Sequence, residues 1–254
     1  MIYGILVVSA VIFLCILANK FSDKFGMPTL ILFMFIGMLF GSDGIVKIPF
    51  DNYELAERVC SIALIFIMFY GGFNTKWKLA RPVAARAVLL STVGVAITAG
   101  VTAILCHFVL RFSMAESFLI GAVLSSTDAA SVFSILRQKK LNLKDGTASL
   151  LEMESGSNDP MSYMLTVIGI GLVGAGETGN IAWNIFSQLT FGSIVGIVFA
   201  IVTILVLTKT NIVTDGLDTI FMISAVLFCY AASEIVGGNQ YLSVYFMGII
   251  IVNS

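Results

Sequence analysis

Long apolar segments alternate with short polar ones along nearly all of the 254 residues. Most of these segments have about the 17 to 25 mainly apolar residues that an α-helix needs to cross a bilayer. The runs are unbroken, which excludes the alternating pattern of a membrane β-barrel. Because only helices and closed barrels satisfy their backbone hydrogen bonds in lipid, the pattern predicts an all-α polytopic membrane protein.

We predict eight membrane-spanning helices and a short, incomplete ninth. The second is also short, and it begins with a proline, a residue suited to the first turn of a helix. The predicted spans are Ile2–Ala18, Pro28–Gly41, Leu55–Phe73, Ala84–Phe108, Ala115–Leu136, Ala148–Val173, Ala182–Leu207, Leu217–Val236 and Tyr241–Val252.

Composition agrees with this class of protein. The chain is 58% hydrophobic and 11% charged, whereas soluble domains have about 25% charged residues. The scattered basic residues argue against a nucleic-acid partner. The four cysteines lie singly in apolar runs without CxxC spacing, so we interpret them as small hydrophobic side chains.

The basic residues also predict an orientation. Eleven of the 14 Lys and Arg residues follow odd-numbered spans, in the loops or at the span ends. Because cytoplasmic loops have an excess of Lys and Arg, we expect the N-terminus to face outside. The first apolar run lacks a basic region before it and an Ala-x-Ala site, so we interpret it as a spanning helix.

A polar stretch interrupts the sixth apolar segment. Residues 152–160 read Glu-Met-Glu-Ser-Gly-Ser-Asn-Asp-Pro. A charged side chain at membrane depth costs at least about 2.5 kcal/mol and typically marks a functional site. On a helix, Ser155 and Asp159 are four residues apart and share a face, as do Glu154 and Asn158.

The chemistry of this stretch points to cation and proton binding. Pro160 lacks an N–H, so the Gly156 carbonyl loses its helical partner. Carboxylate, hydroxyl and carbonyl oxygens are ligands that hard cations accept. Asp159 can hold a proton or a cation but not both, and this competition is sufficient for exchange. For Glu154 a structural salt bridge to a basic residue on a neighbouring helix is an open alternative.

The fifth segment has a second polar cluster near its middle. Ser125-Ser126-Thr127-Asp128 precedes Ala129-Ala130-Ser131. Short polar side chains compete with the helical backbone, so a local break is expected. Broken helices form ion sites at the membrane midplane in carriers. The alternative is that the serine hydroxyls bond back to carbonyls of their own helix and that Asp128 pairs with a lysine.

Other residues receive simpler interpretations. We interpret His107, the only histidine, as a satisfied side chain at the membrane interface. Gly94, Gly100, Gly192 and Gly196 permit close helix approach, and the last two have GxxxG spacing.

Three stretches resemble the monovalent cation:proton antiporters of the sodium/proton exchanger superfamily. Ser126–Phe133 is similar to their unwound crossing helix, Leu151–Pro160 to their ion-binding helix, and Tyr241–Gly248 to a motif of later interface helices. The Asn158-Asp159 pair resembles the Asn-Asp branch. The run Glu-Ser-Gly-Ser-Asn-Asp-Pro-Met most resembles the bacterial potassium/proton subgroup.

The resemblance implies an inverted-repeat fold, alternating access, a homodimer and a location in the cell membrane. By this likeness, residues 1–80 are interface helices and residues 81–175 are core ion-binding helices. Residues 176–254 are then a linker helix and the start of a second repeat. No resident cofactor is implied, only transported K⁺ or Na⁺ and H⁺.

The resemblance also implies roles for single residues. Asp159 is the carboxylate shared by cation and proton, Thr127 and Ser155 supply further oxygens, and Asp128 compensates the half-helix dipoles. Supporting residues are Asn158, Glu154 and Pro160. An asparagine in place of a second acid implies electroneutral exchange. Tyr70 departs from the pattern, because relatives often have an acid there.

Family members have more spans than the nine predicted here. We therefore expect the chain to be an N-terminal portion or a truncated product that does not transport alone, and a non-transporting assembly unit is one alternative function.

An intramembrane hydrolase is another alternative function, with Asp128 and Asp159 as opposed acids, although a Gly-x-Gly-Asp pattern is missing. A serine hydrolase would need His107 as base, far from Ser155. The oxygen ligands suit Na⁺ and K⁺ alike.

Overall fold

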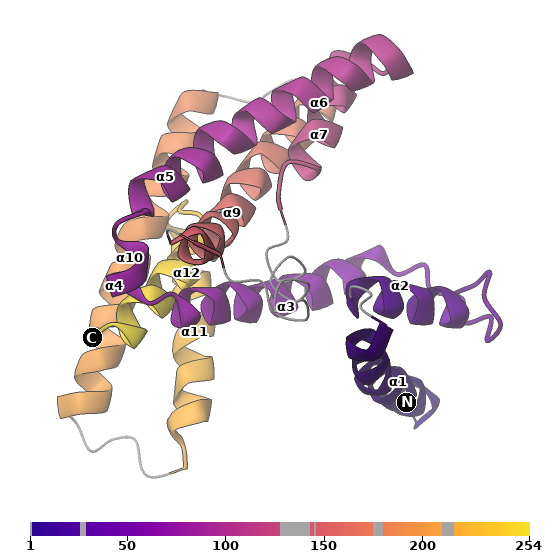
Figure 1. Ribbon diagram of the computed structural model, residues 1–254, viewed down its shortest axis with the longest axis horizontal. Helices are drawn as coiled ribbons and strands as arrows, with labels where there is room; N and C mark the ends of the chain where they lie inside the picture. The colour runs from indigo at the N-terminus through magenta and orange to yellow at the C-terminus, as the bar shows by residue number, and fades with distance from the viewer. Residues whose placement is uncertain (1, 26–28, 128–142, 145, 175–179, 210–215) are drawn as a thin grey trace. The chain divides into compact units, whose positions relative to one another are not determined.

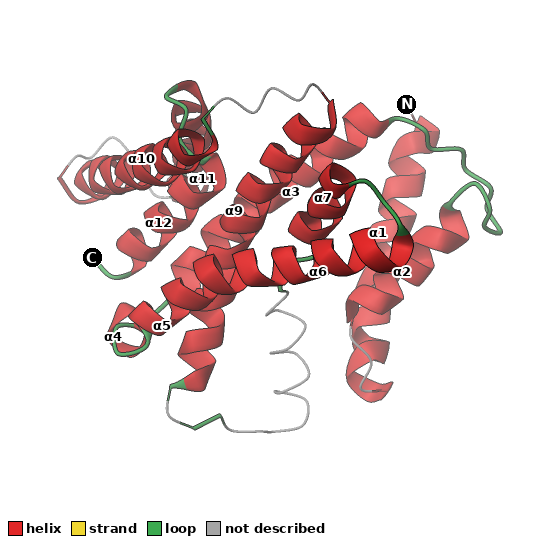
Figure 2. Ribbon diagram, turned by 90° about the horizontal axis from the view of Figure 1, so that it is seen from above, coloured by secondary structure: helices red, strands yellow, loops and turns green. Residues whose placement is uncertain are grey.

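A computed structural model describes residues 2–25, 29–127, 143–144, 146–174, 180–209 and 216–254. Within these ranges all regular secondary structure is helical, as the sequence predicts (Figure 2). The helices are α1 (Ile2–Phe25), α2 (Thr29–Phe40), α3 (Tyr53–Asn74), α4 (Trp77–Ala80), α5 (Ala84–Leu89), η1 (Leu90–Gly94), α6 (Val95–Leu110), α7 (Met114–Val123), α9 (Thr147–Gly174), α10 (Ile181–Lys209), α11 (Asp218–Ile235) and α12 (Gln240–Val252).

The helices follow the predicted spans in order, with three differences. The first runs seven residues past Ala18, to Phe25. The fourth contains a π-helical turn, η1, between α5 and α6, and α4 is a short helix that the pattern does not predict. Among the residues that the structure describes, four stretches are long and apolar enough to cross a membrane: α3, the continuous helix over residues 84–110, α10 and α11.

The chain forms two compact units. The first contains α1, α2 and the first residues of α3. In it, α1 packs against α2, and the hydroxyls of Ser22 and Thr29 are 2.9 Å apart and hydrogen bonded. The second unit contains the rest of α3 and the helices from α4 to α12.

Within the second unit, α7 lies between α6 and α9, and α10 crosses α12 (Figure 1). Of the 13 residues of α12, nine are buried, so this helix is enclosed by its neighbours. Its apolar residues Val244 and Met247 pack with Met68 of α3 and with Val226 and Cys229 of α11.

Glycines set the closest helix contacts, as the GxxxG spacing predicts. Gly192 and Gly196 of α10 lie against the backbone of Asn239 and Ser243, at the start of α12. A side chain at either glycine would overlap that backbone. At Gly100 there is open space, so the prediction of a close approach is wrong there within the described chain.

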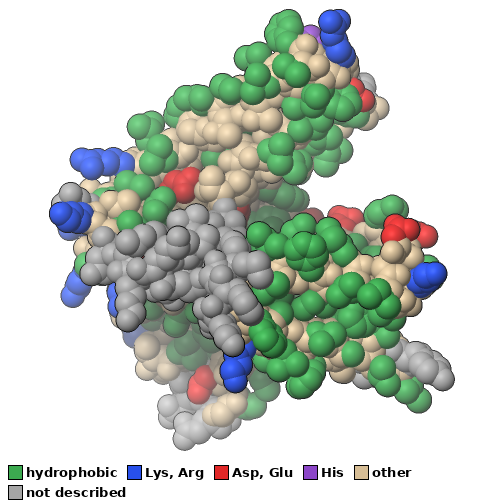
Figure 3. Space-filling model, turned by 45° about the vertical axis from the view of Figure 1, so that its right-hand side comes forward, with side chains coloured by type: hydrophobic (Ala, Val, Ile, Leu, Met, Phe, Trp, Pro, Cys, Tyr) green, Lys and Arg blue, Asp and Glu red, His purple; other side chains and the backbone are tan. Residues whose placement is uncertain are grey.

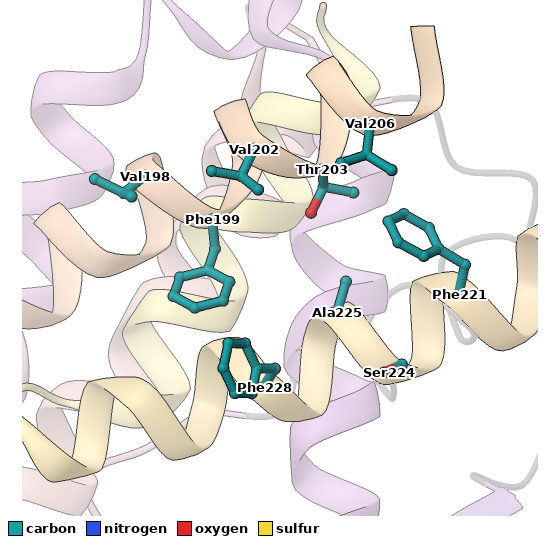
Figure 4. Close-up of a pocket in the computed structure, with 9 residues that line it drawn as sticks. All are labelled: Val198, Phe199, Val202, Thr203, Val206, Phe221, Ser224, Ala225 and Phe228. Carbon is teal, nitrogen blue, oxygen red and sulfur yellow. The ribbon is translucent and has the colours of Figure 1, made fainter. Parts of the chain in front are cut away.

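Hydrophobic side chains cover much of the described surface (Figure 3), as expected for helices in lipid. An apolar groove of about 350 Å³ lies between α10 and α11 (Figure 4). Phe199, Phe221 and Phe228 line it, and its polar atoms belong to Thr203 and Ser224. None of the described residues that line the groove is charged.

Candidate functional site: the end of α7 against α9

The break predicted in the fifth apolar segment begins directly after α7. The helix starts with a capping box between Ser113 and Glu116 and ends at Val123. Residues 124–127 are not helical. The Ser125 hydroxyl donates to the carbonyl of Ala122 at 2.7 Å, so this serine bonds back to its own helix. The broken end therefore leaves Ser126 and Thr127 available to a neighbour.

That neighbour is the polar turn of α9. The Ser126 hydroxyl donates to a carboxylate oxygen of Asp159. The Ser155 hydroxyl donates to the backbone carbonyl of Thr127 at 2.8 Å. Ser155 and Asp159, which the sequence places on one helix face, thus both contact the segment that follows α7.

The second predicted pair, Glu154 and Asn158, also lies at this contact. The Asn158 amide donates to Oε1 of Glu154 at 3.0 Å and to the Thr127 hydroxyl at 2.5 Å. The Thr127 hydroxyl in turn lies 3.3 Å from Oε2 of Glu154. Because Asn158 is fully buried, these bonds satisfy an amide that would otherwise be costly to bury.

Glu154 is therefore held by polar neighbours. Within the ranges that the structure describes, the only ion pair joins Arg58 to Glu54. The open alternative of a salt bridge for Glu154 consequently finds no basic partner in this part of the chain.

Two contacts hold the end of α7 in place. Ser162, one turn beyond the site on α9, donates to the Ala122 carbonyl at 2.7 Å. On the other side, Gly121 lies against the backbone of Ala99 and Ala103 in α6, where a side chain would not fit. The site is thus built on two rigid helix contacts.

Some predicted residues are not placed at this contact. Asp128 and Ser131 lie outside the described residues. Tyr70 is largely exposed on α3. His107 Nδ1 is 2.8 Å from the Phe112 carbonyl, so the histidine is satisfied near the end of α6, as predicted.

The chemistry of the site is that of oxygen ligands. Asp159 and Glu154 contribute carboxylates, and Ser126 and Thr127 contribute hydroxyls. No group of three or more His, Cys, Asp or Glu side chains suited to a metal ion occurs among the described residues. Carboxylate and hydroxyl oxygens without imidazole or thiolate favour hard cations over transition metals.

Comparison with known proteins identifies the family. The family model described as "Sodium/hydrogen exchanger, transmembrane" matches residues 8–254. The chain belongs to the sodium/hydrogen exchanger family. Its relatives are transporters, so the hydrolase alternative is not supported.

Two relatives in this family are named as potassium/proton antiporters. The K(+)/H(+) antiporter NhaP of Alkalimonas amylolytica is 36% identical over 98% of this chain and 44% of its own length. The K(+)/H(+) antiporter NhaP2 of Shewanella sp. (strain MR-4) is 35% identical over 94% of this chain and 42% of its own length. The chain therefore spans less than half the length of these relatives.

The fold is that of a solved sodium proton antiporter. The sodium proton antiporter MjNhaP1 of Methanocaldococcus jannaschii superposes with a TM-score of 0.80 at 22% identity. The match covers 98% of this chain and 64% of that one. The all-helical membrane architecture predicted from the sequence is thus confirmed.

Sequence reasoning did not single out Ser126 as the partner of Asp159. It grouped Ser125, Ser126 and Ser131 as hydroxyls that could bond back to their own helix. Of the two that the structure describes, Ser125 does so, and Ser126 bonds to Asp159 instead. The sequence offered one indication of this role: Ser126 lies at the predicted break in the fifth apolar segment, next to Thr127.

Proposed function

We propose that the protein containing this chain exchanges a monovalent cation, K⁺ or Na⁺, for H⁺ across the cell membrane. One observation supports this above all: the carboxylate of Asp159, in the helix α9 that the sequence predicts as the sixth span, accepts a hydrogen bond from the Ser126 hydroxyl at the end of α7. The names of its relatives, which include K⁺/H⁺ and Na⁺/H⁺ antiporters, point the same way.

In this proposal, Asp159 holds either the cation or the proton. The single negative charge of the carboxylate can be neutralised by a bound cation or by a proton, but not by both at once. The Ser126 hydroxyl donates to the carboxylate when the cation is absent, and it can turn a lone pair toward the cation when one enters. Loading by one ion therefore expels the other.

The remaining residues have supporting roles in the proposal. Thr127 and Ser155 supply oxygens at the site, and Asp128 offsets the dipoles of the broken helix. Glu154 and Asn158 fix the Thr127 hydroxyl through the hydrogen bonds described above. Pro160 leaves the Gly156 carbonyl without its helical partner.

We also propose a homodimer, on the basis of the family likeness, and an N-terminus that faces outside, on the basis of the distribution of basic residues.

The first test is cation-induced dequenching of a pH-sensitive dye in everted membrane vesicles. The vesicles would contain the complete reading frame that includes this chain, and K⁺ and Na⁺ would be compared over a range of pH. Dequenching by either ion supports exchange and identifies the cation. Confirmed membrane expression without dequenching by either ion would contradict the proposal and favour a non-transporting assembly unit.

Changing Glu154 to glutamine is expected to weaken exchange without abolishing it. The variant retains an oxygen for Asn158 but loses the negative charge beside Thr127. A hydrogen bond to a charged group contributes about 1.5–3 kcal/mol, so we expect cation affinity to fall about tenfold. Dequenching titrations measure this affinity. The control is Glu152→Gln, an exposed acid on the same helix; equal effects of the two changes would contradict the role given to Glu154.

Exchange is also expected to be electroneutral. Asn158 is neutral, so the Asn158-Asp159 pair offers one negative charge to one cation or one proton. Flux in proteoliposomes should then be the same at imposed membrane potentials of either sign. Movement of a net charge would couple to the potential by about 2.3 kcal/mol per 100 mV, and a rate that changes with the potential would therefore rule out one-for-one exchange.

A further inference from the structure

Asn239 joins three helices next to the site. It is fully buried directly before α12. Its side-chain amide donates to the Pro160 carbonyl in α9 at 3.2 Å. Its side-chain oxygen accepts the Leu242 N–H at 2.9 Å and caps α12. Its backbone N–H donates to the Gln188 carbonyl in α10 at 2.9 Å.

These contacts fix the orientation of the Asn239 amide. The Leu242 N–H is a donor, so the oxygen of the amide has to face it. The nitrogen then has to face the Pro160 carbonyl, which is an acceptor. A residue that offers only an oxygen can replace the cap but cannot replace the bond to α9.

The turn of α9 that Asn239 contacts lacks a hydrogen bond of its own. Pro160 has no N–H to give to the Gly156 carbonyl, so the helix is weakened over residues 156–160. Asp159 lies in this turn. Asn239 does not replace the missing bond to Gly156, but it binds the carbonyl of Pro160 at the C-terminal end of the weakened turn, and such turns in membrane helices are supported by neighbouring elements.

The start of α12 packs closely against α10 and is hydrogen bonded to it through the Asn239 N–H and the Gln188 carbonyl. Gly192 of α10 lies so close to Asn239 that a side chain there would come within 2.7 Å of its carbonyl oxygen. Gly238 packs equally closely against the backbone of Phe191 and Gly192. Asn239 is therefore anchored on α10 while its side chain reaches α9.

We infer that Asn239 is a positioning residue, which holds the proline-weakened turn of α9 so that Asp159 meets Ser126. This inference rests on the proposed function for its effect on exchange. It adds a residue outside the polar stretches of the fifth and sixth apolar segments, and it links α10 and α12 to the cation site.

The test uses Asn239→Ser and Asn239→Asp in the complete reading frame. Both replacements can cap α12 through an oxygen, and both lose the donor to Pro160. Asn253→Ser is the matched control, because Asn253 lies at the other end of α12 and also bonds across elements, to the Thr75 carbonyl at 2.9 Å. Two readouts are needed: the half-saturating cation concentration across pH, and hydrogen exchange of the amides over residues 161–164.

For the Asn239→Ser variant we expect a half-saturating cation concentration about tenfold higher, with the maximal rate at saturating cation largely retained. Amides over residues 161–164 should exchange faster than in the wild type and in Asn253→Ser. If the Asn239→Asp variant folds, it should show the same two changes. If it does not fold, the result for Asn239→Ser alone tests the inference.

Two results would overturn the inference. One is unchanged exchange of these amides in Asn239→Ser. The other is a lower thermal stability with an unchanged half-saturating concentration, which would leave Asn239 with a purely structural role. Absence of cation-dependent flux in the wild type would instead count against the proposed function, and the amide readout would still decide whether Asn239 holds the turn.

Discussion

Replacing Asp159 with asparagine is expected to abolish cation-dependent proton flux, with a fall of at least about 100-fold. Asp159 is half-buried, and the change removes the negative charge that would neutralise the transported cation; a 100-fold fall corresponds to about 2.8 kcal/mol. An amide can neither bind a proton in this pH range nor neutralise a cation. It still offers an oxygen to the Ser126 hydroxyl, so the contact between α7 and α9 should survive. Dye dequenching in everted vesicles and proton flux in proteoliposomes both measure the loss.

The control for Asp159→Asn is Glu152→Gln. Both changes replace an acid on α9 by its amide, but Glu152 is exposed, and its loss should leave the flux within about twofold. The amount of protein in the membrane and its thermal unfolding should match the wild type in both variants, because the replacements conserve side-chain volume. Flux above a tenth of the wild-type value in Asp159→Asn would place the exchanging carboxylate elsewhere.

Much of the fold could be predicted from the sequence, because a lipid environment leaves few alternatives. An apolar run of sufficient length has to be a helix, and the order of runs therefore gave the order of helices. The π-helical turn η1 (Leu90–Gly94) was not predicted, because its residues fit a regular α-helix as well as a π-helical turn. The extension of α1 to Phe25 was missed because its last residues are polar.

The candidate site was only partly predictable. Helical spacing placed Ser155 with Asp159 and Glu154 with Asn158, because both pairs lie four residues apart. The contacts that complete the site join distant segments: Ser126 reaches Asp159 across 33 residues, and Asn239 reaches Pro160 across 79. Spacing along one helix contains no information about such partners.

The contact between α10 and α12 provides the prediction with the largest expected effect on stability. A Cβ at position 196 would lie 3.0 Å from the Ser243 carbonyl carbon and closer still to its oxygen. Both atoms belong to backbone and cannot move without moving α12. Gly196→Ala should therefore lower the stability by about 1–3 kcal/mol, the usual effect of overpacking.

Gly100→Ala is the matched control for Gly196→Ala. Both glycines lie inside long membrane helices, but the space at Gly100 is open. Alanine there should be neutral or raise the stability by about 0.5–1 kcal/mol, because glycine loses more backbone entropy in a helix. Thermal unfolding of the purified proteins in the same lipid or detergent measures both changes. Because α12 begins next to Asn239, a shift forced at position 196 should also weaken cation binding. Equal unfolding temperatures for the two variants would mean that α10 and α12 do not approach each other at Gly196.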